Sequence, residues 1–505
     1  MTKSTEEAQN PLRQSAPEPE ALQLIPEAMA RKYMVIPMTI SNNILRVAMA
    51  NPTDIFALEA LASWTQLRIE PDEAPHDEIL DAIDFNYKAY DEIQQKISSI
   101  STVDEGEEAE KSRIDTSIEA PVAQALTMIV DEAVKARASD IHLQPGEDKL
   151  RVRYRIDGTL HDMFSLPLTT AISLISRIKI LAKMNIADHQ RPQDGQFTVK
   201  TKGRAIDVRV GTIATVNGEM STLRLLDKSR ATLSLSELGF MPDSLKSFEE
   251  MLKVSYGIIL ISGPTGAGKT TSLYASINTL DRVEQNIITV EDPVEYHFEN
   301  INQIQVNPRA GLTFASGLRS ILRLDPDVIL IGEIRDAETA NIAIQSALTG
   351  HLVLSSIHAN DTVGVVLRLI DLGVEPFLVS SALIGVVSQR MVRRICPSCG
   401  SPTEVSSAEA LAYQQEMGEE KDTFVYGSGC KNCSNTGYRG RTGIFEILRV
   451  TEDIKTILLK GGTAIDIRHQ AIAEGMVPLA MDGMMKVKEG MTTPSEVLRN
   501  AYTGN

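Results

Sequence analysis

A glycine-rich loop between an apolar strand and a helix constrains this chain more than any other stretch. Residues 257–262 read Gly-Ile-Ile-Leu-Ile-Ser, which predicts a buried strand, and residues 263–271 read Gly-Pro-Thr-Gly-Ala-Gly-Lys-Thr-Thr. The second segment fits G-x-x-x-x-G-K-[ST], the P-loop that cradles phosphates with backbone N–H groups. Glycines let those groups approach an anion without a Cβ in the way, and the next helix directs its positive end to the same place. We therefore predict a nucleotide-binding α/β domain built around this loop.

The motif assigns roles to individual residues of the loop. Lys269 is expected to reach the β- and γ-phosphates of ATP, and Thr270 to ligate Mg²⁺. The alternative is a glycine-rich turn that happens to precede Lys-Thr, and the flanking strand and helix argue against it. The residues predicted to bind ATP and Mg²⁺ here are Gly263, Pro264, Thr265, Gly266, Ala267, Gly268, Lys269, Thr270 and Thr271.

Further apolar strands end in side chains that can do chemistry. They are predicted at 286–290, 328–331 and 352–357, followed by Glu291, by Gly332-Glu333 and by His358. Ligands of open α/β sheets bind outside the carboxyl ends of parallel strands, so these side chains are expected to surround the nucleotide. Glu333 or Glu291 could activate the attacking water, and the sequence does not divide these roles. His358 could donate to the γ-phosphate, although a single histidine after a strand is more often structural.

Arginines are expected near the phosphates, because phosphoryl transfer depends on positioning and charge neutralisation. Arg319, Arg323 and Arg335 are candidates, and for each the simpler interpretation is a surface ion pair. Segments 150–156 and 206–210 alternate apolar with charged residues, mostly arginine. This pattern predicts half-buried strands with arginines on one face. That face is either merely solvated or in contact with phosphate.

The four cysteines form two C-x-x-C pairs, Cys396 with Cys399 and Cys430 with Cys433. Four thiolates suit a closed tetrahedral zinc site, which makes the metal structural and not catalytic. Redox dithiols are the weaker alternative, because the second pair runs into a glycine-rich turn and not into a helix. The first residues contain no apolar signal region, which favours metal over disulfides and predicts a cytoplasmic protein.

Together these motifs resemble one family, the secretion ATPases that drive type II secretion and type IV pilus assembly. The family's N2 signature is matched at 138–142 and 153–158, its aspartate box at 289–295, its Walker B segment at 325–336 and its histidine box at 349–358. The cysteine pairs resemble the zinc subdomain of assembly-type members, so a retraction motor fits less well. The resemblance covers residues 138–443 and, more weakly, both ends.

The resemblance implies a RecA-like P-loop ATPase domain, a PAS-like N2 α+β domain, a small N-terminal α/β domain (N1) and a zinc-knuckle subdomain. It predicts N1, a docking domain, at 1–92, an acidic linker at 93–115, N2 at 116–235 and the ATPase domain at 236–505, with the zinc subdomain near 394–442. Arg209 and Arg224 match family arginines that reach the nucleotide from N2. The family's Ser-x-x-Pro-Thr after Arg209-Val210 is replaced by Gly-Thr-Ile-Ala-Thr at 211–215.

The resemblance also implies an assembly and its partners. The expected enzyme is a homo-hexamer that hydrolyses ATP with Mg²⁺, contains structural Zn²⁺ and powers the addition of pilin-like subunits to a filament. An inner-membrane platform protein and a cytoplasmic domain of a membrane-anchored protein are the expected partners, so the chain should lie at the inner face of the cytoplasmic membrane. The arginine-led segment with which some N1 modules bind cyclic di-GMP is not visible, and no such site is predicted.

Other functions remain open at this point. RecA-like hexamers also move nucleic acid, but a formal net charge of -17 and 5% aromatic residues argue against such a partner. A nucleotide-binding scaffold that does not hydrolyse is the other alternative, and the presence of Lys269, Glu291 and Glu333 argues against it. The sequence does not distinguish type II secretion from pilus assembly.

Overall fold

The computed structural model describes residues 17, 19–41, 43–76, 78–80, 82–83, 87, 116–201, 204–226 and 233–502. The predicted linker at 93–115 lies outside these residues. The chain divides into two compact units, each described here on its own: Met1–Asp227, with which the loop Gly429–Thr436 is grouped, and Lys228–Ser428 together with Gly437–Asn505. None of the described helices is both long enough and apolar enough to cross a membrane.

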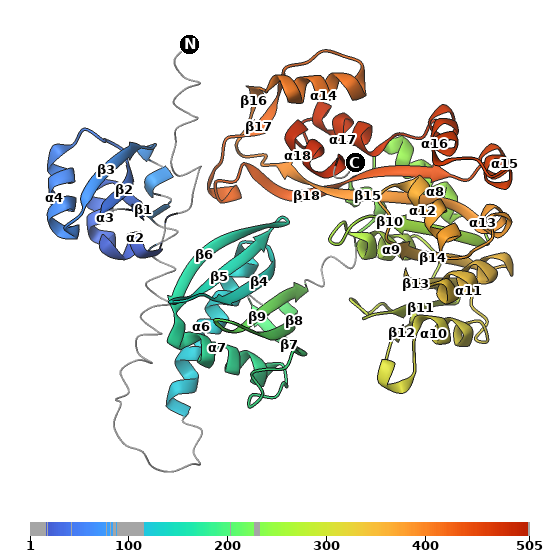
Figure 1. Cartoon of the computed structure of the whole chain (residues 1–505), viewed down its shortest axis with the longest axis horizontal. Coiled ribbons are helices and arrows are strands. Elements are labelled where there is room, and N and C mark those ends of the chain that lie inside the picture. Colours follow the sequence, from blue (N-terminus) through green and yellow to red (C-terminus); the bar gives the residue numbers. More distant parts are fainter. Residues whose placement is uncertain are drawn as a thin grey trace. The chain divides into compact units, whose positions relative to one another are not determined.

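The first unit begins with a small sheet of its own (Figure 1). The elements are α2 (Pro19–Leu24), α3 (Glu27–Tyr33), β1 (Val35–Ser41), β2 (Ile44–Met49), α4 (Ile55–Thr65) and β3 (Arg68–Glu73). β1 pairs antiparallel with β2, and β2 pairs parallel with β3. Asp54 caps α4 by accepting from the Ala57 amide at 3.1 Å, which explains why the chain turns into a helix after β2.

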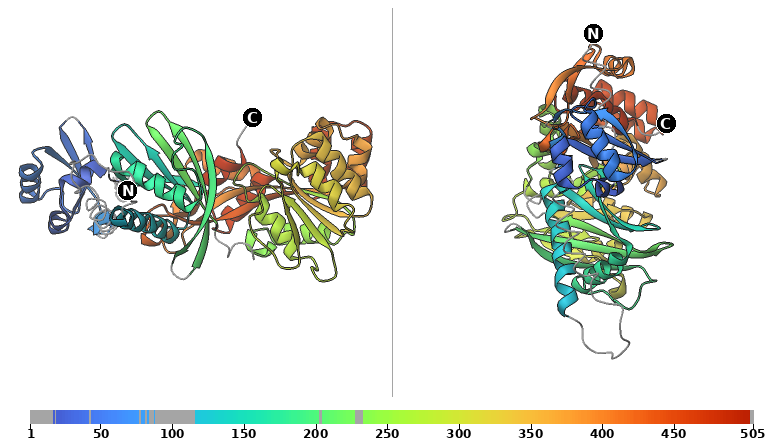
Figure 2. Two further views of the ribbon diagram at one scale, coloured as in Figure 1. Left: turned by 90° about the horizontal axis from the view of Figure 1, so that it is seen from below. Right: turned by 90° about the vertical axis from the view of Figure 1, so that its left-hand side faces the viewer.

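The second part of this unit is a six-stranded antiparallel sheet with two helices against it (Figures 1 and 2). Its elements are α6 (Thr116–Lys135), β4 (Ala138–Pro145), β5 (Lys149–Ile156), β6 (Thr159–Pro167), α7 (Leu168–Leu181), β7 (Gln193–Thr201), β8 (Arg204–Thr215) and β9 (Gly218–Leu226), and the strand order is β6-β5-β4-β9-β8-β7. The apolar members of the alternating strands, such as Val152 and Tyr154, are buried, and Tyr154 donates to the Ile129 carbonyl of α6 at 2.7 Å. The arginines therefore lie on the opposite face, as the alternation predicted.

The second unit is built on a seven-stranded sheet with the order β12-β11-β13-β14-β10-β15-β18. The strands are β10 (Gly257–Ser262), β11 (Ile287–Glu291), β12 (Asn302–Gln305), β13 (Val328–Ile334), β14 (Leu352–Ile357), β15 (Leu383–Ile395) and β18 (Tyr438–Arg449). All neighbours are parallel except the edge pair β15 and β18. The P-loop strand β10 lies between β14 and β15, so its carboxyl end is flanked on both sides. The predicted parallel α/β sheet is confirmed.

Helices cover both faces of this sheet, because its inner strands are apolar throughout. Alternate residues of β10 enter different cores: Ile258 and Leu260 pack with one group of helices, and Ile259 and Ile261 with another. The first group is α10 (Phe314–Ile321), α11 (Ala337–Leu348), α12 (Thr362–Asp371), α13 (Pro376–Ala382), α15 (Glu452–Leu459) and α16 (Ala464–Ala473). The second is α8 (Pro242–Leu252) and α9 (Lys269–Asn278), with the 3-10 turn η3 (Leu235–Leu238).

The remaining elements of the second half surround the cysteine segment. A two-stranded antiparallel sheet, β16 (Gly400–Glu404) with β17 (Thr423–Gly427), packs near α14 (Ser407–Met417), α17 (Leu479–Lys488) and α18 (Pro494–Ala501). Two further 3-10 turns are η4 (Pro308–Ala310) and η5 (Lys431–Cys433). α14 lies between the two C-x-x-C pairs in the chain.

Candidate functional site

The P-loop has the backbone that an anion cradle requires. Gly263, Gly266 and Gly268 have φ values of 145°, 80° and 87°, in the left-handed region that favours glycine. A Cβ on Gly263 would lie 2.4 Å from the carbonyl oxygen of Gln389, so no other residue fits there. Thr270 is exposed in the first turn of α9, where its hydroxyl is accessible to an ion. These features fit Mg²⁺ and a nucleotide phosphate at the loop.

Lys269 is held at the opening of this loop. Its Nζ donates to the carbonyls of Gly263 at 2.7 Å and Pro264 at 3.2 Å. Burial, followed by the positive charge of Arg390, lowers the pKa of Lys269 to about 8. A bound phosphate would offset both causes of the shift, since it supplies a counter-charge to the buried ammonium.

Glu333 lies inside a strand and not after one, which corrects the predicted strand end at 331. β13 continues to Ile334, and its register with β14 shifts between Ile331 and Ile334. Such an irregularity re-aims a side chain locally, which explains how an acid within a strand reaches the edge of the sheet. Glu333 forms an ion pair with Arg335, and its Oε2 lies 3.3 Å from Nε2 of His358.

His358 joins this group from the end of β14. Burial, together with the charges of Lys269 and Arg335, lowers the pKa of His358, so its imidazole is neutral at pH 7. A neutral histidine can donate one hydrogen bond while its other nitrogen accepts. The structure therefore brings Glu333, Arg335 and His358 together, and Lys269 lies close enough for its charge to act on His358.

Glu291 differs from Glu333 in its surroundings. It is buried at the end of β11 and accepts from the Tyr274 hydroxyl, from Thr289 Oγ1 at 2.6 Å and from Gln303 Nε2 at 3.2 Å. Burial and the adjacent carboxylate raise the pKa of Tyr274, which therefore stays a donor. Hydrogen bonds to a carboxylate stabilise its charged form and lower its basicity. Because Glu291 already accepts these bonds, it is poorly suited to take a proton from a water molecule.

The other arginine candidates lie in different environments. Arg319 pairs with Glu338, which matches the surface ion-pair interpretation, and Arg323 is exposed. Among the described residues, Arg335 is the one of these three arginines that contacts a predicted catalytic side chain, Glu333.

The arginine face of the first unit contains an ordered row of charges across neighbouring strands. Arg209 on β8 is directly opposite Arg224 on β9, which is opposite Asp140 on β4, which is opposite Arg155 on β5. The buried Asp140 accepts from Arg224 Nε at 3.0 Å and lies 3.6 Å from Arg155 Nε. The row thus places three arginines and one carboxylate side by side on neighbouring strands, and Asp140 pairs with two of the arginines.

His142 lies one row further along this face. Burial, followed by the charge of Arg155, lowers its pKa. The role of Asp140 in this row was missed by the sequence reasoning, because only the strand register shows that it faces two arginines.

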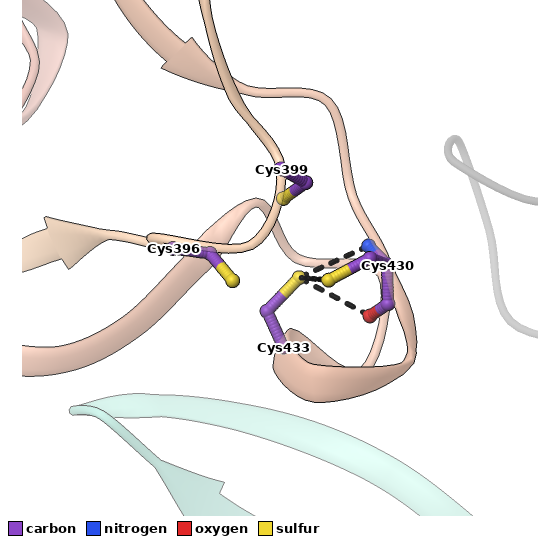
Figure 3. Close-up of side chains that lie close together, drawn as sticks. All are labelled: Cys396, Cys399, Cys430 and Cys433. Carbon is purple, nitrogen blue, oxygen red and sulfur yellow. Dashed lines mark hydrogen bonds between the residues drawn. The ribbon is translucent and has the colours of Figure 1, made fainter.

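The four cysteines converge, as Figure 3 shows. Their sulfur atoms all lie within 4.8 Å of one another, and Sγ of Cys430 and Cys433 are 3.7 Å apart. A tetrahedral zinc site with Zn–S bonds of about 2.3 Å separates its sulfurs by roughly 3.8 Å. None of the four forms a disulfide in the described structure. The donor set and its spacing fit a metal ion.

Two polar residues of β15 contribute to the site and were not predicted. Gln389 is buried and donates from Nε2 to the Ala267 carbonyl of the P-loop at 2.6 Å. Arg390, also buried, donates from Nη2 to the Asn360 carbonyl at 3.0 Å. The available signal was a Gln-Arg dipeptide directly after the apolar residues 383–387, because long polar side chains are seldom buried in a sheet.

Comparisons with known proteins identify the family that this chain matches. A family model described as "Type II/IV secretion system protein" matches residues 115–499, and an "MshEN domain" model matches residues 11–92. The chain is 40% identical to the type IV pilus assembly ATPase PilB of Myxococcus xanthus over 96% of this chain and 87% of that protein. It is 45% identical to the type II secretion system protein E of Dickeya dadantii over 76% of this chain and 77% of that protein.

Solved structures support the fold alone. The Legionella pneumophila ATPase DotB superposes with a TM-score of 0.56 at 21% identity, covering 77% of this chain and 96% of DotB. The pilus retraction motor PilT, solved with ADP, gives a TM-score of 0.52 at 24% identity, covering 74% of this chain and 96% of that one.

Proposed function

The chain belongs to the family of type II and type IV secretion ATPases, and from that premise we propose that it is the motor ATPase that extends a type IV pilus. The observation that carries this choice is the extent of the match to the pilus assembly ATPase of Myxococcus xanthus. That match spans 96% of this chain, whereas the match to the Dickeya dadantii type II protein spans 76%. A shared N-terminal region supports a shared docking partner, because the motor domain is common to both systems.

The proposed chemistry uses the residues at the P-loop. The loop amides and Lys269 hold the phosphates, and Thr270 ligates Mg²⁺, which would neutralise charge on the transferred group. Glu333 orients and deprotonates the attacking water, and neutral His358 donates to a γ-phosphate oxygen. Glu291 keeps β11 and α9 together through its bond to Tyr274.

We infer that zinc completes the cysteine cluster. Cys396, Cys399, Cys430 and Cys433 would fill its coordination shell, which leaves no open position for substrate. The ion would cross-link two segments separated by β16, α14 and β17 and so contribute directly to folding.

The remaining proposals concern assembly. The chain forms a homo-hexamer in which Arg209 and Arg224 of N2 reach a nucleotide bound at a P-loop. N1 (1–92) docks on the cytoplasmic domain of a membrane-anchored partner, the motor acts on an inner-membrane platform protein, and the chain is located at the inner face of the cytoplasmic membrane. The strand register supports the first proposal, because it places Arg209 directly opposite Arg224, which pairs with Asp140, on one face of the sheet.

A Lys269→Ala strain tests the function. Surface pili are counted, and the proteins released to the medium are profiled. Lost pili with normal secretion is the expected result. Lost secretion with intact pili would instead make the chain a type II secretion motor, which the 45% identity to the Dickeya dadantii protein favours as the second candidate. If neither the pili nor the secreted proteins change, both candidate functions are contradicted.

A further inference from the structure

The segment that follows His358 is held by four charged side chains, here called the anchor cluster: Asp361, Arg390, Glu446 and Arg468. They come from four different elements or their ends: the start of α12, β15, β18 and α16. Two acids and two arginines balance one another in charge. None of the four belongs to the predicted site residues, so their convergence beside the nucleotide loop requires its own explanation.

The two carboxylates fix the start of α12. Glu446, which is buried, accepts from the Thr362 amide at 3.1 Å and the Thr362 hydroxyl at 2.6 Å. Asp361 caps the helix by accepting from the Gly364 amide at 2.7 Å, and its other oxygen accepts from Arg468 at 2.6 Å. These bonds therefore fix the segment that follows His358 at the end where it enters α12.

Arg390 anchors the middle of the same segment. Its Nη2 donates to the Asn360 carbonyl at 3.0 Å, whereas its Nη1 is buried and makes no hydrogen bond. The residue is only 7% exposed, so an incompletely satisfied guanidinium is costly there. A buried charge kept at such a cost is more consistent with a role at the site than with stability alone.

Arg390 also belongs to the strand that supports the P-loop. β15 pairs with β10 up to Ser262 and Ser388, two residues before Arg390. The intervening Gln389 contacts the loop through Ala267 and through Gly263. The charge of Arg390 acts on Lys269, whose pKa it helps to lower. The residue thus connects the nucleotide loop with the segment that carries His358.

We propose that Arg390 is a positioning residue for ATP hydrolysis: it ties segment 358–362 to the strand that supports the P-loop, and so sets where His358 stands relative to Glu333 and the γ-phosphate. The inference rests on the proposed ATPase chemistry. Arginine suits the task because its planar guanidinium donates in several fixed directions, whereas lysine offers a single flexible ammonium.

The test compares Arg390→Gln and Arg390→Lys in the full-length chain with Arg394→Gln, an exposed arginine on the same strand. Arg390→Gln is expected to lower kcat at least about 20-fold with KM for ATP within about threefold, the pattern of a lost transition-state interaction. Arg390→Lys should recover part of kcat because it restores the charge. Amide hydrogen exchange in residues 358–364 should be faster in Arg390→Gln, while exchange in 263–275 stays at the wild-type rate. Arg394→Gln should match the wild type in all measurements.

The outcomes separate this inference from the proposed function. If the Lys269→Ala variant hydrolyses ATP at the wild-type rate, the ATPase assignment is overturned, and this inference with it. If Lys269→Ala abolishes turnover but Arg390→Gln retains wild-type kcat and wild-type amide exchange, this inference alone is overturned. Should Arg390→Gln fail to fold, Arg390→Lys decides: wild-type kcat together with wild-type exchange in 358–364 contradicts a positioning role.

Discussion

At the residue scale, the two candidate acids have different environments despite similar places in the sequence. Both follow an apolar strand core. Glu291 is buried and accepts three side-chain hydrogen bonds, whereas Glu333 forms an ion pair with Arg335 and lies near His358. This difference supports the proposal that Glu333, and not Glu291, activates the attacking water.

Glu333→Gln should retain ATP binding and lose most hydrolysis, because an amide cannot take the proton of the attacking water. General-base removal typically costs about 10²–10⁴-fold in rate, and we expect kcat to fall within that range. Steady-state turnover and binding of a fluorescent nucleotide check both parts. Rapid turnover in Glu333→Gln, with loss of turnover in Glu291→Gln, would assign the base to Glu291.

Glu291→Gln should instead destabilise the fold. The amide replaces one acceptor oxygen by a donor, so the Tyr274 or Thr289 hydroxyl loses its buried partner at a cost of about 1–3 kcal/mol. Thermal unfolding of the variant should show a lower Tm than Glu333→Gln, whose side chain lies at the edge of the sheet. Equal Tm values for the two variants would contradict the structural role of Glu291.

Nucleotide affinity should depend on pH through Lys269. With a pKa of about 8, the side chain is protonated below that pH in the free protein and neutral above it. Phosphate binding requires the ammonium, so affinity should be constant between pH 7 and 7.5 and fall up to about tenfold per pH unit above 8. Equilibrium binding at pH 7 to 9.5 measures this. Lys269→Arg, which stays charged, should lose the dependence if it binds nucleotide, and a flat wild-type profile would contradict the assignment.

At the element scale, the proposed zinc ion would contribute to the cysteine segment what packing does not. The segment contains short strands and turns, with the second cysteine pair at the turn η5, and such elements order poorly alone. An ion bound by the four converging sulfurs would supply the cross-link that the limited apolar core around α14 does not.

Cys396→Ser should abolish zinc binding and lower the Tm, because structural zinc adds directly to folding free energy. Metal content by atomic absorption and thermal unfolding measure the two effects. Ser398→Ala, an exposed position between the first two cysteines, is the matched control and should retain zinc. Wild-type metal content in Cys396→Ser would remove the zinc assignment.

At the scale of the whole molecule, the N-terminal part has its own sheet and its own core, formed by residues such as Ile36, Val47 and Leu61. A part with a separate core can serve a separate role. The family model matched at 115–499 begins after it, and a different model matches 11–92. The proposed docking role of N1 can therefore be tested separately from ATP hydrolysis.

Removing residues 1–92 should leave ATP turnover within about twofold of the full chain but abolish pilus extension, since separate domains contribute nearly independently. Turnover is measured on the purified protein, and pili are counted in a strain that carries only the truncated chain. Pili at the wild-type number would contradict the docking role, and lost turnover would show that N1 is needed for the active assembly.

The sequence by itself determined the nucleotide loop, the parallel sheet, the arginine face and the four-cysteine cluster. Each depends on local spacing or strand periodicity, which the chain order records directly. The tertiary structure decided that Glu291 is surrounded by hydrogen-bond donors, whereas Glu333 pairs with Arg335. It also decided that Asp140 faces Arg224 and Arg155, and that Arg390 and Glu446 hold the segment after His358. These contacts join residues far apart in the chain, and no periodicity encodes them, because they depend on strand order, register and the bulge near Glu333.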